Sequence, residues 1–151
     1  MKRFLLLAIA LLVCAGCFVS CDSLMSEVGK TVSVQALDAL EKELQNVEFD
    51  EFERYDDQEI ADIRADLIDD GVALKGEITG GMEGYYENPE TGHWVMQGAL
   101  GVSLMEDADL LVQYFEEQYA IEVSEGRAEI VNGGWLVSIT VSSLPLDTEA
   151  E

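Results

Sequence analysis

The pattern of apolar and polar positions predicts two helices in the first half of the chain. The first begins after Ser33, a residue suited to capping a helix, and its apolar positions recur at helical spacing: Val34, Leu37, Leu40, Leu44 and Val47. The second begins at Asp56 or Asp57 and has an apolar face made of Ile60, Ile63, Leu67 and Ile68. Gly71 is placed to end it.

A period of two replaces the helical period after Gly71 and predicts a long β-hairpin. Residues 72–79 alternate between apolar and polar, and the strand resumes at Tyr85. The glycines Gly80, Gly81 and Gly84 predict a bulge or bend. The segment from Asn88 to Gly92 contains the proline and glycine typical of a turn, and residues 94–102 form the return strand.

A third helix and a second hairpin complete the pattern. Ser103 and Glu106 match a capping box, which predicts a helix with Glu106 and Asp107 on its outer side. Its apolar face consists of Leu104, Ala108, Leu111, Val112, Phe115 and Tyr119. Residues 121–124 are predicted to be a short strand, and residues 127–131 and 135–141 to pair across Asn132 and Gly133. The order α-α-β-β-α-β-β predicts an α+β fold, an antiparallel sheet of four or five strands with helices on one face.

The first 21 residues have a different composition. Lys2 and Arg3 precede an apolar core, and the uncharged run from Phe4 to Val19 has 16 residues. A transmembrane helix needs about 20 apolar residues, so a cleaved export signal is the better interpretation. Simple secretion and an uncleaved anchor are the alternatives.

The cysteines Cys14, Cys17 and Cys21 all lie in this leader. The leader resembles that of bacterial lipoproteins, in which a small residue precedes a cysteine that receives a lipid. Ala15-Gly16-Cys17 and Val19-Ser20-Cys21 both match, and we favour Cys21 because cleavage there leaves no unmodified thiol. The resemblance implies a lipid-anchored protein on the extracytoplasmic side of a bacterial membrane, with palmitate among its acyl groups.

Cleavage before Cys21 divides the chain into four segments. They are a signal peptide (1–20), a lipid-anchored tether (21–32), a single acidic domain (33–144) and a flexible acidic tail (145–151). The chain has 31 acidic and 8 basic residues, and removal of Lys2 and Arg3 leaves a charge of −25. Such a surface repels nucleic acid and anionic lipid head groups, so a covalent lipid, and not charge, would hold the protein to a membrane.

Few residues offer catalytic or metal-binding chemistry. His93 is the single histidine and no cysteine follows residue 21, so a structural zinc site is not expected. The acidic window 48–59 lacks the glycine and residue order of an EF-hand loop and is interpreted as a solvated connection. No catalytic residue, metal site or cofactor is predicted.

The aromatic residues around the predicted turn offer a binding patch, which consists of Tyr85, Tyr86, His93 and Trp94. We therefore predict a non-catalytic binding or scaffolding module of the cell envelope. Its expected partners are the membrane, through a covalent lipid, and an envelope protein or a cationic ligand. A small envelope hydrolase that uses carboxylates, with or without His93, and a divalent-cation-binding domain are the alternatives.

Overall fold

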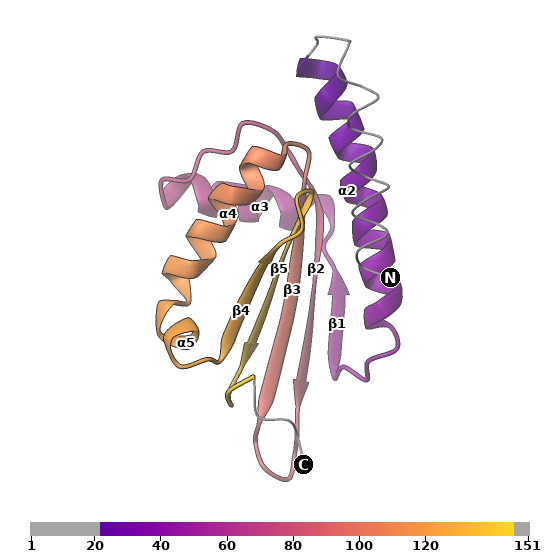
Figure 1. The fold of residues 1–151 in the computed structure, drawn as a ribbon. Helices are drawn as coiled ribbons and strands as arrows, with labels where there is room; N and C mark the ends of the chain where they lie inside the picture. The colour runs from indigo at the N-terminus through magenta and orange to yellow at the C-terminus, as the bar shows by residue number, and fades with distance from the viewer. Residues whose placement is uncertain (1–21, 147–151) are drawn as a thin grey trace.

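A computed structural model describes residues 22–146 of the chain (Figure 1). The expectations for the leader, including Cys17 and Cys21, and for residues 147–151 lie outside this range. The elements are α2 (Asp22–Leu44), β1 (Glu51–Arg54), α3 (Asp57–Asp69), β2 (Ile78–Glu87), β3 (Trp94–Val102), α4 (Met105–Gln118), α5 (Ala120–Ser124), β4 (Ala128–Asn132) and β5 (Leu136–Ser142). The predicted α+β class and the predicted order of the main helices and hairpins are confirmed.

The strands form one antiparallel sheet in the order β1-β2-β3-β5-β4. The predicted turn joins β2 and β3: the Asn88 N–H donates to the His93 carbonyl over 2.7 Å, and Gly92 has a φ of +75°. The register shifts between Ile78 and Gly80, where the glycines predicted a bulge. The β2–β3 hairpin extends beyond the helices, and its tip lies at the opposite end of the molecule from the start of α2 (Figure 1).

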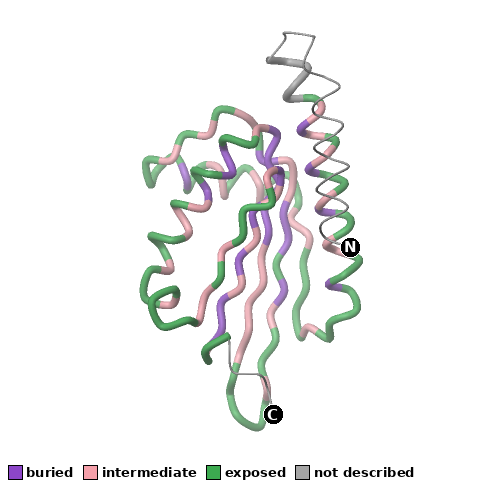
Figure 2. Tube along the Cα trace, viewed as in Figure 1, coloured by how far each residue is buried: buried purple, intermediate pink, exposed green. Residues whose placement is uncertain are grey.

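Helices cover both faces of the sheet. One face, here the α3–α4 face, packs against α3 and α4 through the buried residues Leu67, Ile78, Leu100, Val102, Ala108, Leu111 and Val137. The other, the α2 face, packs against α2 through Leu37, Leu44, Met82 and Ala99. The predicted packing of helices on one face thus holds for α3 and α4, whereas α2 packs on the opposite side. Figure 2 shows the buried residues concentrated where the helices cross the sheet, and mostly exposed residues at the hairpin tip.

The first helix begins earlier than its predicted cap. Among the described residues α2 starts at Asp22, so the segment predicted to be a tether is helical from that residue on. Ser33 does not cap a helix; it is fully buried inside α2, and its hydroxyl lies 2.7 Å from Oγ1 of Thr79 in β2. The Arg54 guanidinium donates to the carboxylates of Asp38 and Glu41 in α2 over 2.8 and 2.7 Å, and so ties the edge strand β1 to the helix.

The alternating residues 72–77 are a loop and not a strand, because α4 supplies their partners. Asp107, predicted to be exposed, is fully buried and accepts hydrogen bonds from the Lys75 and Gly76 amides over 2.9 and 2.7 Å. Ser103, predicted to cap α4, accepts from the Glu77 amide over 2.8 Å, and α4 begins at Met105 without a side-chain cap. Side chains thus satisfy backbone groups that a sheet would otherwise pair.

The ends of α3 follow the prediction, whereas two short elements do not. Asp56 and Glu59 form a capping box, and Gly71 has a φ of +85° at the C-terminal end. The acidic window 48–59, predicted to be a connection, contains β1, which pairs with β2. Residues 120–124, predicted to be a strand in part, form α5.

Candidate functional site

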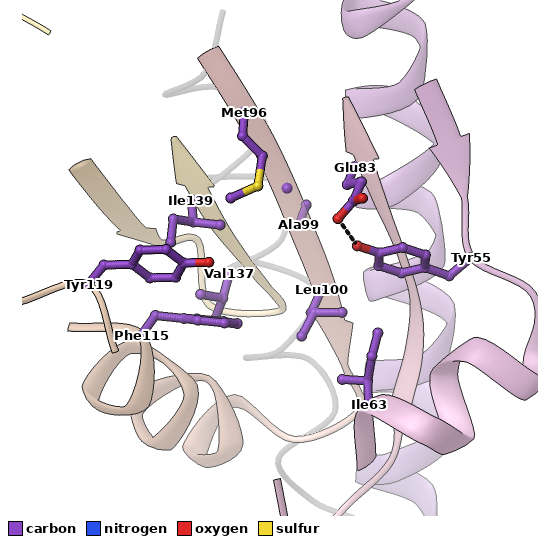
Figure 3. Close-up of a pocket in the computed structure, with 11 residues that line it drawn as sticks. Tyr55, Ile63, Glu83, Met96, Ala99, Leu100, Phe115, Tyr119, Val137 and Ile139 are labelled. Atoms are coloured by element: carbon purple, nitrogen blue, oxygen red, sulfur yellow. Dashed lines mark hydrogen bonds between the residues drawn. The ribbon is translucent and has the colours of Figure 1, made fainter. Parts of the chain in front are cut away.

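An apolar cleft of about 200 Å³ opens on the α3–α4 face (Figure 3). Its floor is the sheet, which contributes Met96, Leu100, Val137 and Ile139. Phe115 and Tyr119, from the C-terminal end of α4, form one wall. Tyr55, the residue after β1, and Ile63, in the middle of α3, form the other. The cleft exists because α3 and α4 contact different strands and leave the sheet between them uncovered.

Gly98 has no side chain and so leaves space above the middle of the cleft floor. It lies in β3 opposite Ile139 of β5 and lines the cleft. A Cβ atom at this position would meet Ile139 Cγ2 at 3.5 Å and the Met82 carbonyl oxygen at 3.6 Å, which are ordinary van der Waals contacts. The backbone therefore accepts a side chain at residue 98, and a large one would project into the cleft.

Two tyrosines and one glutamate give the apolar cleft a polar rim. The Tyr55 hydroxyl donates to the Glu83 carboxylate over 2.7 Å, and Glu83 itself is exposed to solvent (Figure 3). Burial, followed by the hydrogen bond to Glu83, raises the pKa of Tyr55. Burial, followed by the charges of Glu122 and Glu83, raises the pKa of Tyr119. Both phenols are therefore neutral near pH 7 and present hydroxyl groups at the cleft.

The structure separates the residues of the predicted aromatic patch. Tyr85 and Trp94 stack with ring centroids 6.5 Å apart. Tyr85 pairs with Met96 across the β2–β3 ladder, so the stack lies on the α3–α4 face and extends the cleft floor toward the hairpin tip. Tyr86 pairs with Val95 and points to the α2 face. Whether these residues bind a ligand stays a prediction.

His93 lies exposed in the turn between β2 and β3. Its backbone N–H donates to Thr91 Oγ1 over 3.3 Å, and its carbonyl accepts from Asn88. Between residues 22 and 146, no group of three histidine, cysteine, aspartate or glutamate side chains is arranged to hold a metal ion.

Sequence reasoning missed Glu83, Gly98, Tyr55 and Tyr119 as members of one site. A signal existed for Glu83. Side chains alternate between the two faces of a strand, so Glu83 is expected on the same face as Gly81 and Tyr85. No comparable signal existed for Tyr55 and Tyr119. They are 64 positions apart, and only the packing of helices on the sheet brings them to opposite walls of the cleft.

No family model, curated protein or solved structure that was compared with the chain matches it. In the part of the chain that the structure describes, no helix combines the length and apolar character needed to cross a membrane.

Proposed function

We propose that this protein is a lipid-anchored binding module of the bacterial cell envelope, with the cleft on the α3–α4 face as its ligand site. The cleft carries the proposal: binding sites for small molecules are concave and mostly apolar, with a few converging polar groups. This cleft has an apolar floor, two tyrosine hydroxyls and one carboxylate. Its volume suits a group about the size of an aromatic ring, since an engineered cavity of ~150 Å³ accepts benzene.

The leader supports the anchor and the extracytoplasmic location. A basic start, a short apolar core and the cysteines Cys17 and Cys21 are the features of a lipoprotein signal. Because α2 begins at Asp22, a lipid on Cys21 would join the domain at the start of this helix. The β2–β3 hairpin tip lies at the other end of the molecule, so a membrane at the anchor would leave it clear (Figure 1).

Substitution of Gly98 by leucine tests the cleft. We expect 2-phenylethanol, an uncharged probe with one aromatic ring, to bind the wild-type chain in a ligand-observed NMR titration and to lose at least fivefold in affinity for Gly98→Leu. Thr140→Leu is the matched control, because Thr140 lies on the neighbouring strand and points to the α2 face. No binding to wild type, or equal losses in both variants, would show that the cleft is not the site.

Metabolic labelling with a fatty-acid probe tests the anchor. We expect label on the wild-type chain, its loss in Cys21→Ala and its retention in Cys17→Ala. Loss in Cys17→Ala alone would move the lipid to the alternative site. A wild-type chain without label, or label that persists in the double variant, would contradict lipidation.

A further inference from the structure

The apolar cleft continues into an acidic depression on the same side of the molecule. The depression has an open volume of about 510 Å³ and is lined by Asp50, Glu51, Phe52, Glu53, Glu83 and Tyr85. Glu83 lines both hollows. Glu53 pairs with Glu83 across the β1–β2 ladder, so the two side chains lie side by side on the α3–α4 face. An apolar hollow and an anionic hollow therefore meet at one carboxylate.

The carboxylates at this junction repel one another. The neighbouring carboxylate of Glu59, followed by partial desolvation and the negative charges of Glu83 and Asp56, raises the pKa of Glu53. Like charges on directly opposed strand positions destabilise a sheet. A cation at the junction would remove this repulsion. The raised pKa of Glu53 thus agrees with the geometry, in which an acidic hollow adjoins the apolar cleft.

The basic side chains of the described segment form their ion pairs elsewhere. Lys30 pairs with Glu27 and Glu77, Arg54 with Asp38 and Glu41, Lys75 with Glu106, and Arg127 with Glu125. None of these six pairs includes Glu53, Glu59 or Glu83. Within residues 22–146, these ion pairs thus leave the negative charge of the junction unneutralised.

We propose that the two hollows form one site for a small organic cation, an amine that carries an apolar group of about one ring. The apolar group lies over Gly98 between Tyr119 and Tyr55, and the ammonium lies between Glu83 and Glu53. The Tyr85 ring, at the edge of the depression, adds the π face that favours an ammonium group. This inference rests on the proposed function, since it names the ligand class of the same cleft.

Three probes with one ring and different end groups separate charge from shape. They are 2-phenylethylamine, 2-phenylethanol and 3-phenylpropionate, titrated by ligand-observed NMR against the full chain in lipid nanodiscs, with empty nanodiscs subtracted. We expect the amine to bind at least fivefold more tightly than the alcohol, and the carboxylate to bind most weakly. Amine binding should weaken as salt rises, because solvent-exposed charges are screened.

Glu83→Gln identifies the carboxylate, since glutamine keeps an acceptor for the Tyr55 hydroxyl. We expect it to weaken the amine roughly two- to fivefold, the range for one partly exposed ion pair, and to leave the alcohol unchanged. Glu129→Gln is the matched control, because Glu129 is exposed on β4 and points to the α2 face. Gly98→Leu should weaken the amine and the alcohol alike.

The outcomes separate this inference from the proposed function. Equal affinity for amine and alcohol in the wild-type chain overturns the cation site and leaves the apolar cleft standing. Equal losses of amine affinity in Glu83→Gln and Glu129→Gln would show that the preference for the amine comes from the overall charge of the protein. This result also overturns the inference. Amine binding that survives Gly98→Leu shows that the hollows are not one site. If the alcohol does not bind the wild-type chain, the proposed function itself fails, whatever the amine does.

Discussion

The two faces of the sheet are built from alternate residues of the same strands, and yet one is closed and the other is open. On the α2 face, the single helix α2 lies against β2 and β3, and glycines at the contact let the helix pack closely on the sheet. On the α3–α4 face, two helices contact different parts of the sheet and leave a cleft between them. Glycines have opposite consequences on the two faces: Gly29 closes a helix onto the sheet, whereas Gly98 keeps a hollow open.

Substitution of Gly29 by alanine tests the closed face most directly. A Cβ atom there would overlap the Ser103 carbonyl oxygen and come within 2.6 Å of Trp135 Cζ3. We expect a loss of roughly 3 kcal/mol in the free energy of unfolding, measured by urea denaturation. The sign is informative, because Gly→Ala in an exposed helix interior stabilises by about 1 kcal/mol.

Gly98→Ala is the matched control for this substitution. Its new Cβ would make only ordinary contacts, so we expect a change within about 0.5 kcal/mol. Equal costs at Gly29 and Gly98 would contradict the difference between the closed and the open face.

Truncation of one large side chain on each face gives a smaller contrast. Leu37 of α2 is fully buried against the sheet, and we expect Leu37→Ala to cost about 3 kcal/mol in the free energy of unfolding. Met96 is only partly buried at the cleft, so Met96→Ala should cost less than about 1 kcal/mol. Denaturation of both variants under the same conditions provides the comparison, and a larger loss at Met96 would show that the cleft is packed more tightly than described.

The smallest effect concerns the link between α3 and α4 on the open face. The Tyr114 hydroxyl of α4 donates to the Asp70 carboxylate at the end of α3 over 2.7 Å, and this bond is the main cause that raises the pKa of Tyr114 to about 12. We expect Asp70→Asn to bring the phenol back toward its ordinary pKa of about 10, observed as phenolate absorbance during an alkaline titration. Tyr114→Phe identifies the transition by removing it.

The same bond has a defined effect on stability. The pKa of Tyr114 is higher in the folded than in the unfolded chain. The hydrogen bond therefore contributes fully to stability below about pH 10, and this contribution is lost as the pH rises through about 12. The pair is largely exposed, so solvent limits the contribution to less than about 1 kcal/mol. If Tyr114 titrates at the same pH in Asp70→Asn as in the wild-type chain, the hydrogen bond to Asp70 is not what raises its pKa.

The sequence predicted the elements whose signals are local. The helix start at Asp56 or Asp57, the stop at Gly71 and the turn from Asn88 to Gly92 depend on neighbouring residues alone, and the structure has all three. Errors occurred where a distant partner competes with a local one. Ser103 matched a cap, but its hydroxyl bonds to the Glu77 amide, 26 residues away. Asp107 matched an exposed helix position, but it is buried against the loop at Lys75 and Gly76.

By itself, the sequence determined the α+β class, the two hairpins and the strong negative charge, because periodicity, turn residues and composition are properties of short segments. The tertiary structure alone decided which helix covers which face, and hence where a cleft remains. Alternation in β2 already puts Glu83 and Tyr85 on one face, but nothing local brings Tyr55 and Tyr119 to opposite walls above them. That arrangement depends on how helices far apart in the chain pack across one sheet.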